Sequence, residues 1–248
     1  MQLSVRELRL GSGLVMLTYI SLHLFNHMLG IVSLPLAEHG LRWSIWLWGT
    51  VPGTAALYGA FALHLALALR TIYLRAHWRL PPSEWLRLWS GFSLPLLLIG
   101  HAVGTRLASS LYGVVPSYEK TIAGLIASGS QGWQIALLAP GWLHGCMGLW
   151  ISLRRNATIR SARRWYIAAV ILVPMLSALG FVRMSQSVES HHAVAVAVAA
   201  ANAGPVGSDA AALATWRHAL LASYVLLLIG AFAGNRWRDA HGSAPDPQ

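Results

Sequence analysis

The sequence is poor in charge and in cysteine. Only 10% of its 248 residues are Asp, Glu, Lys or Arg, against roughly 25% in an ordinary soluble domain. The single cysteine, Cys146, excludes an intrachain disulfide, a thiolate zinc cage and a cysteine-held iron–sulfur cluster. The sequence also has no glycine-rich phosphate loop, nucleophile–base pair or carboxylate dyad. These absences argue against a free soluble enzyme.

Apolar residues are abundant instead. They make up 56% of the chain, and the mean hydropathy is +0.54. Since about 20 helical residues cross the ~30 Å hydrocarbon core of a bilayer, we predict an all-α membrane protein with six transmembrane helices. Six stretches lack Asp, Glu, Lys and Arg altogether: residues 12–35, 50–69, 88–105, 132–153, 165–182 and 218–235.

The basic residues predict the orientation, because Lys and Arg collect in cytoplasmic loops. If the N-terminus is cytoplasmic, the inner segments hold 13 of the 18 Lys and Arg residues. Both termini are therefore predicted to be cytoplasmic, and the net charge of +10 reflects topology rather than nucleic-acid binding. The inner residues are Arg6, Arg9, Arg70, Arg75, Arg79, Arg87, Arg154, Arg155, Arg160, Arg163, Arg164, Arg236 and Arg238.

The same pattern divides the chain into parts. Residues 1–186 hold the first five spans, 187–212 form an outer, periplasmic loop, 213–235 hold the sixth span and 236–248 form a cytoplasmic tail or linker. The Ala- and Val-rich run at 193–201 suits a short surface helix. A signal peptide at the N-terminus is disfavoured, because the first apolar run is long and no A-x-A cleavage site follows it.

Histidines lie inside each of the first four spans. They are His23 and His27 in the first, His64 in the second, His101 in the third and His144 in the fourth. Ionisable residues at membrane depth are costly and usually face the bundle interior for a function. A buried neutral imidazole has a free lone pair, which a metal ligand requires. One histidine on each of four consecutive spans favours ligation over hydrogen bonding between helices.

The depth of each histidine predicts two levels. His23 and His101 each lie 14 residues from the nearest inner arginine, whereas His64 and His144 lie 6 and 10 residues away. At 1.5 Å per residue these are an outer pair at about 21 Å and an inner pair at about 9 and 15 Å. In an up-down bundle, spans one and three are diagonal neighbours, as are spans two and four. Each level therefore offers two imidazoles to one b-type haem, and we predict two haems.

The sequence leaves more than one role for several candidate site residues. His27 is an alternative to His23, because the two share one helical face, although the level favours His23. Arg106 and Arg183 lie where outer haem propionates would emerge, but interfacial arginines also occur for other reasons. Small residues near the histidines leave room for a porphyrin or, alternatively, make helix–helix contacts; they are Gly30, Gly59, Ala60, Gly100, Gly104, Gly141, Gly145 and Gly148.

Two motifs resemble a known family. His101 to Arg106, His-Ala-Val-Gly-Thr-Arg, and His144 to Trp150, His-Gly-Cys-Met-Gly-Leu-Trp, resemble stretches of the dihaem cytochrome b subunits of succinate dehydrogenase and fumarate reductase. In that family the matching histidines are axial ligands. Residues 1–186, opening with His23-Leu24-Phe25-Asn26-His27, resemble the six-span haem-binding anchor of bacterial class III adenylate cyclases.

The resemblance implies a redox role in the bacterial inner membrane. A dihaem anchor would exchange electrons with, or sense, the quinone pool and pass that state to a cytoplasmic catalytic domain; a cyclase partner would also imply a homodimer. No cyclase domain lies within these 248 residues, so cyclase activity is not assigned to them. Two alternatives are an anchor subunit that binds flavoprotein and iron–sulfur subunits, and a haem-free anchor or transporter.

Overall fold

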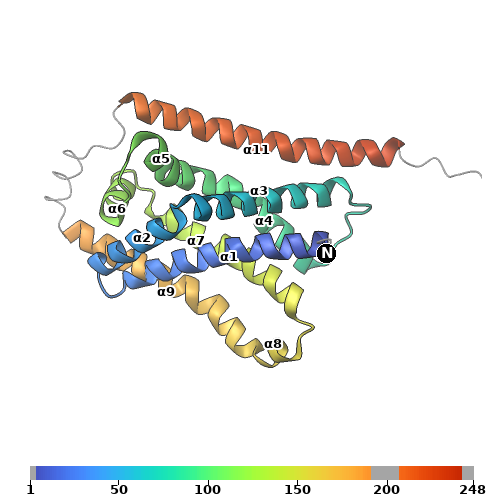
Figure 1. The fold of residues 1–248 in the computed structure, drawn as a ribbon, viewed down its shortest axis with the longest axis horizontal. Coiled ribbons are helices and arrows are strands. Elements are labelled where there is room, and N and C mark those ends of the chain that lie inside the picture. The colour runs from blue at the N-terminus through green and yellow to red at the C-terminus, as the bar shows by residue number, and fades with distance from the viewer. Residues whose placement is uncertain (1–3, 191–206, 242–248) are drawn as a thin grey trace, which may run out of the picture.

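The computed structural model describes residues 4–190 and 207–241, and all regular structure in these ranges is helical (Figure 1). Six helical segments are long and apolar enough to cross a membrane, which confirms the predicted all-helical fold and its number of candidate spans within the described residues. They are α1 (Val5–Leu29), α3 (Val51–Tyr73), α4 with its continuation (Pro82–Tyr112), α7 (Gln131–Leu153), α9 (Arg163–Ser190) and α11 (Gly207–His241).

Local sequence explains where several helices begin. Ser4 caps α1 in a reciprocal capping box, because its hydroxyl accepts from the Glu7 amide while the Glu7 carboxylate accepts from the Ser4 amide. Thr50 caps α3 in one direction, because its hydroxyl accepts from the Gly53 amide, and Pro52 follows in the first turn, where its missing N–H costs nothing. These caps fix the entry of the two helices that carry His23, His27 and His64.

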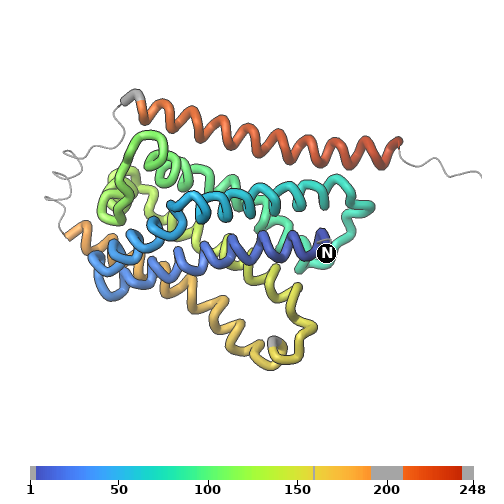
Figure 2. The backbone as a smooth tube through the Cα atoms, in the orientation of Figure 1, coloured from blue at the N-terminus to red at the C-terminus, as the bar shows by residue number. Residues whose placement is uncertain are grey.

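The first four spans form a bundle. α1 packs against α3 and α7, and α7 also packs against α4. This arrangement puts α1 diagonally across from α4, and α3 diagonally across from α7, as predicted. α9 packs on α1 and α7, whereas α11 lies along α3 and α4 on the opposite edge of the bundle (Figures 1 and 2).

The third span is not a uniform α-helix. α4 (Pro82–Ala102) passes into a π-helical turn, η1 (Val103–Leu107), and then into α5 (Ala108–Tyr112). The Thr105 hydroxyl donates to the His101 carbonyl, one turn earlier, at 2.7 Å. The irregular turn therefore begins directly after a candidate ligand.

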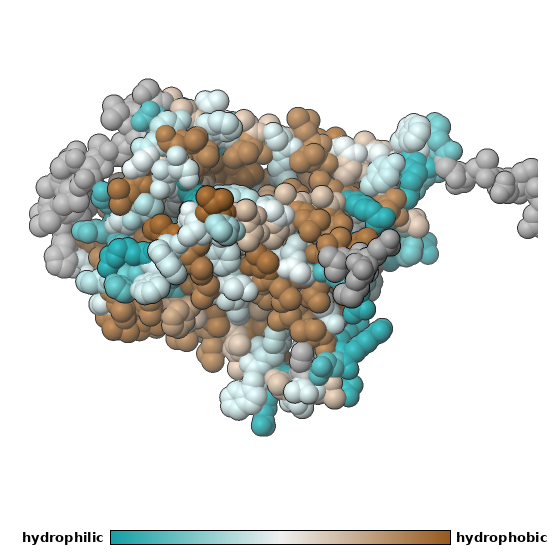
Figure 3. All heavy atoms as spheres, in the orientation of Figure 1, coloured by the Kyte–Doolittle hydropathy of each residue, from teal (hydrophilic) through white to brown (hydrophobic). Residues whose placement is uncertain are grey.

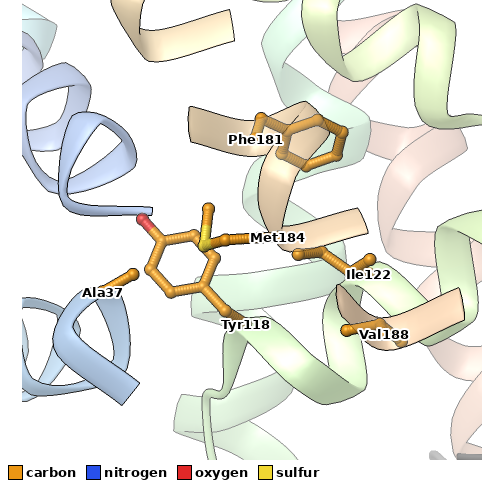
Figure 4. Packing of buried hydrophobic residues seen from close by; sticks show 6 residues of the cluster. All are labelled: Ala37, Tyr118, Ile122, Phe181, Met184 and Val188. Atoms are coloured by element: carbon orange, nitrogen blue, oxygen red, sulfur yellow. The ribbon is translucent and has the colours of Figure 1, made fainter. Parts of the chain in front are cut away.

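Two short helices cover one end of the bundle, and the sequence did not predict them. The first apolar stretch ends at Leu29 rather than at 35, and α2 (Leu34–Trp48) then returns toward α3. α6 (Tyr118–Ala127) lies beside α2 and α9. Figure 4 shows the core between these three helices, in which Tyr118 and Met184 pack together. The other members of this cluster are Ala37, Ile122, Phe181 and Val188.

The last two helices extend beyond their predicted bounds. α9 continues to Ser190 and α11 begins at Gly207, so both ends of the predicted 187–212 loop are helical; the run 193–201 lies outside the described residues. α11 also continues to His241, past the predicted end at 235. Near this end Asn235 joins α11 to the end of α3 and the loop that follows, because its amide donates to the carbonyls of Tyr73 and Arg75.

The surface agrees with a membrane location. Brown, apolar side chains cover the middle of the molecule, and teal, hydrophilic ones gather toward its two ends (Figure 3). Exposed apolar residues such as Leu226, Ile229 and Met175 belong to the membrane-spanning helices. α1 begins and α11 ends at the same end of the bundle (Figure 2). With the orientation predicted from the sequence this is the inner end, and the end covered by α2 and α6 is the outer end; the two names are used in that sense below.

Candidate haem-binding site

The structure brings the four histidines together in the two predicted pairs. His23 on α1 and His101 on α4 have ring centroids 5.9 Å apart, with the ring planes at 71°. His64 on α3 and His144 on α7 have centroids 6.3 Å apart, with the planes at 85°. Each pair spans one diagonal of the bundle, so two imidazoles face each other at each level.

The inner pair has a defined hydrogen-bonding state. His144 Nδ1 lies 3.1 Å from the Arg87 carbonyl oxygen, which can only accept, so Nδ1 carries the proton and Nε2 keeps its lone pair. The Ser90 hydroxyl lies 3.3 Å from the same nitrogen. His64 Nδ1 contacts the Ser12 hydroxyl at 3.1 Å. Because that hydroxyl donates to the Leu8 carbonyl, it accepts from His64, which likewise leaves Nε2 free.

Two glycines make room for the inner rings. A Cβ atom at Gly91 on α4 would lie 2.7 Å from His144 Cε1, so only glycine fits there without moving the imidazole. A Cβ at Gly13 on α1 would lie 3.4 Å from His64 Cε1, which is ordinary contact at its lower limit. Each glycine follows the serine that holds the same ring, so a Ser-Gly pair supports each inner histidine from the neighbouring helix.

The sequence analysis did not use these Ser-Gly pairs, although a signal was present. Residues 9–23 and 87–101 share the pattern Arg-Leu-x-Ser-Gly followed by nine residues and His. The pattern covers the serine, the glycine and the outer histidine of each helix. Ser12 holds His64 on the next span, and Ser90 holds His144 on the next span. α1 with α3 and α4 with α7 are thus two hairpins with the same internal arrangement.

The outer pair differs in its neighbours. His101 Nδ1 contacts the Gln134 side-chain oxygen at 3.1 Å, again on the next span. His23 instead contacts His27, with the two Nε2 atoms 3.2 Å apart. His27 is buried, its Nδ1 has no hydrogen-bond partner among the described residues, and its ring packs against Tyr118 and Phe181. The structure thus places both candidate outer ligands of α1 beside one another.

Polar residues join α1 to the outer helices. The Asn26 amide donates to the Tyr118 hydroxyl at 3.0 Å. Glu38 on α2 accepts from the Ser117 hydroxyl at 2.7 Å and from the Glu119 amide at 3.0 Å, at the beginning of α6. Burial raises the pKa of the Tyr118 phenol, and the Glu38 carboxylate raises it further, so this hydroxyl is neutral. These hydrogen bonds join α2 to α6 and hold α6 against α1 beside His27.

The two predicted propionate contacts have different surroundings. Arg106 donates to the Thr54 hydroxyl at 2.8 Å and to the Trp48 carbonyl at 3.4 Å, and so ties η1 to the beginning of α3. Arg183 lies exposed on α9. Neither arginine is placed against a histidine pair by these contacts, so their role toward a haem stays a prediction.

Three of the eight small residues highlighted in the sequence make close helix contacts. Added Cβ atoms at Gly141 and Gly145 would each lie 2.7 Å from α1, at Ile20 and Leu17. A Cβ at Gly30 would lie 2.7 Å from Met184 on α9. Gly59, Gly104 and Gly148 have nothing within 4 Å of an added Cβ. The alternative of close helix packing therefore applies to Gly30, Gly141 and Gly145.

Comparison with known proteins gives no match, whether to family models, curated proteins or solved structures. The described residues also hold no group of three or more His, Cys, Asp or Glu side chains that could hold a metal ion. A haem needs only two protein ligands, because the porphyrin nitrogens supply the other four. Within residues 4–190 and 207–241, the two imidazole pairs are therefore the side chains that could ligate the iron of a haem.

Proposed function

We propose that this chain is a membrane cytochrome that binds two b-type haems, one between His23 and His101 and one between His64 and His144. The separation of the rings carries the proposal. An imidazole nitrogen lies about 1.1 Å from its ring centroid and about 2 Å from a metal that it ligates, so two axial imidazoles on one iron have centroids about 6 Å apart. The observed separations of 5.9 and 6.3 Å fit that value.

The hydrogen bonds of the rings support the same role. A ligating histidine usually donates its second N–H to a carbonyl, hydroxyl or carboxylate, which fixes the tautomer and orients the ring. Ser12, the Arg87 carbonyl and Gln134 accept from His64, His144 and His101 in this manner. When bound, a haem with two such ligands supplies one-electron transfer without an open coordination position.

The wider role is electron exchange between the quinone pool and a partner at the inner end. The two levels lie one above the other along the bundle and would give electrons a path through the membrane. The partner would be a cytoplasmic effector, such as an adenylate cyclase domain that reads the redox state, or the flavoprotein and iron–sulfur subunits of a quinone oxidoreductase. The predicted location is the bacterial inner membrane, with both termini cytoplasmic.

A haem-free anchor or transporter is the competing function. Aromatic rings in direct edge-to-face contact also have centroids about 4.5 to 7 Å apart, so the separations suit a histidine network without iron. In that case the bonds at Ser12, Ser90 and Gln134 would serve helix packing alone.

A visible spectrum of the purified chain separates the two functions. The protein is expressed with ample haem supply and purified in detergent. Its reduced-minus-oxidised spectrum is recorded, and haem is counted per polypeptide. We expect sharp low-spin b-type bands and about two haems per chain. A colourless protein would overturn the cytochrome and leave the histidines to packing or transport. Co-purified flavoprotein and iron–sulfur subunits would favour the oxidoreductase over the sensor.

A further inference from the structure

The segment that joins α7 to α9 is strongly basic. Residues 154–164 contain the short helix α8 (Ala157–Ser161) and hold five arginines without any Asp or Glu. The arginines are Arg154, Arg155, Arg160, Arg163 and Arg164. All five are exposed. The other inner segments each include a carboxylate, at Glu7, Glu84 or Asp239. Membrane topology requires only an excess of positive charge on the inner side, so it does not by itself explain five arginines without a counter-charge.

The protein supplies no counter-charge to these arginines from elsewhere in the fold. No ion pair between two described residues involves any of the five, whereas Arg238 at the same end pairs with Asp239 at 3.3 Å. Arg164 instead lies over the ring of Trp165, with its Cζ atom 5.5 Å from the centroid. Exposed like charges held this close together repel one another and attract anions from outside the chain.

A groove of about 280 Å³ begins beside the arginines, between the inner half of α7 and the first two turns of α9. Arg163 lines it together with Tyr166, whose hydroxyl is already paired because it donates to the Cys146 carbonyl. The remaining lining residues are Leu143, Cys146, Met147, Trp150, Ile167 and Val170. The groove therefore has apolar walls and one cationic side chain that is free to bind a ligand.

The groove extends from the membrane interface into the hydrocarbon. Val170 lies seven residues after Arg163 in α9, which is about 10 Å farther along the helix. Near Arg163, Trp150 stacks on Tyr166 with centroids 5.5 Å apart, and Trp and Tyr collect at the head-group level of a bilayer. Figure 1 shows α7 and α9 meeting at α8, apart from the other spans. A molecule with an anionic end and an apolar chain fits this arrangement.

We propose that this groove binds an anionic phospholipid of the phosphatidylglycerol type. The phosphate accepts hydrogen bonds from the Arg163 guanidinium, which suits its paired oxygens, and one acyl chain lies between α7 and α9. The site goes beyond the cytochrome function and does not depend on it, because none of the candidate haem ligands lines the groove.

The charge and the groove together favour this occupant over the alternatives. A zwitterionic phospholipid also has a phosphate, but its cationic choline group would be repelled by the other four arginines. An acidic soluble partner would pair with the arginines and leave the apolar walls uncovered. An anionic phospholipid satisfies both features at once, and the bilayer supplies it.

Photo-crosslinking tests the site in the full chain. The protein is placed in phosphatidylcholine nanodiscs with a trace of phosphatidylglycerol that carries a diazirine in one acyl chain, and labelled peptides are identified by mass spectrometry. We expect label within residues 143–170, displaced as the fraction of unlabelled phosphatidylglycerol rises. The same diazirine on phosphatidylcholine should not favour these residues over other exposed spans. Equal labelling by the two probes, or phosphatidylglycerol label only elsewhere, would overturn the proposal.

Arg163→Gln tests the cationic end of the groove. It keeps a polar side chain and removes one charge, which is worth about fivefold in affinity, or about 1 kcal/mol, near anionic lipid. About five times more unlabelled phosphatidylglycerol should therefore be needed for the same displacement. Arg6→Gln is the matched control, because Arg6 is an exposed inner arginine that does not line the groove. Equal curves for the two variants would show a diffuse surface charge and overturn the site.

A second pair of variants tests the apolar part. Ile167 lines the groove, whereas Ile171 is exposed one turn farther along α9 and does not line it. Ile167→Trp fills the space between the helices and should abolish the displaceable label, and Ile171→Trp should leave it unchanged. Displaceable label that survives in Ile167→Trp would mean that the acyl chain does not lie in the groove, and would overturn the proposal.

Discussion

The inner and outer histidine pairs use the same helices and differ in how firmly their surroundings define them. At the inner level each ring has one tautomer, one Ser-Gly support and no competing histidine. At the outer level His101 has a partner in Gln134, but His23 shares its Nε2 with His27. The inner site is preorganised for two ligands, whereas the outer site offers three imidazoles for two positions.

The two levels differ because different helices hold their rings in place. The inner rings are held by serines and a carbonyl on the bundle helices themselves. The outer rings lie beneath α2 and α6, which are held by Asn26, Tyr118 and Glu38. A site built from span helices is more rigid than one closed by short helices, so we expect the outer level to be more easily altered.

The strongest test of the two levels removes one ligand from each. His64→Ala and His101→Ala should each lose one haem, because each variant removes one of the two imidazoles that would hold the iron at that level. Haem per polypeptide should fall from about two to about one in each variant, as measured by pyridine haemochrome. His218→Ala, which changes an exposed histidine of α11, should keep both haems. Two haems in His101→Ala would refute the outer pair.

The competition between His23 and His27 can be decided by two variants. His23→Ala should remove the outer haem, whereas His27→Ala should retain it and change only its spectrum or reduction potential, because His23 lies at the level of His101. Electron paramagnetic resonance of the oxidised protein reports each low-spin iron separately. The reverse result would assign the outer haem ligand to His27. In both variants the signal of the inner haem serves as the internal reference.

The space beside His144 gives a graded test of the inner level. Gly91→Ala places a methyl group against the imidazole, and overpacking of this kind costs about 1 to 3 kcal/mol. We expect the inner haem to dissociate about 5 to 150 times more readily, while the outer haem is unaffected. Gly132→Ala on α7 is the control, since nothing lies within 4 Å of its added Cβ. Equal haem affinity in both variants would show that Gly91 does not support the site.

The smallest expected effects concern the hydrogen bonds to the inner rings. Ser12→Ala removes the hydroxyl that holds His64, and loss of such a partner typically weakens metal binding at least tenfold. Ser90→Ala should have a smaller effect, about threefold, because the Arg87 carbonyl still accepts from His144. Haem transfer to apomyoglobin measures both. A larger effect of Ser90→Ala would contradict the assigned hydrogen bonds.

The sequence predicted the spans and the pairing of histidines because both follow from one-dimensional counts. Charge-free stretches identified the helices, and the distance from an arginine to a histidine along a helix gave its depth. The outer helices were missed, because α2 carries Glu38, His39 and Arg42 and reads as a polar loop. Residues near His144 such as Gly91 belong to another helix, so local periodicity could not connect them, although the repeated Arg-Leu-x-Ser-Gly pattern was present.

The repeated hairpin has a consequence for assembly. α1 with α3 supplies one outer and one inner histidine, and α4 with α7 supplies the other two. Neither half can complete a haem site alone, so each bound haem would act as a crosslink between the two halves. Haem insertion would then add two links between halves that already pack closely where Gly141 and Gly145 of α7 meet α1.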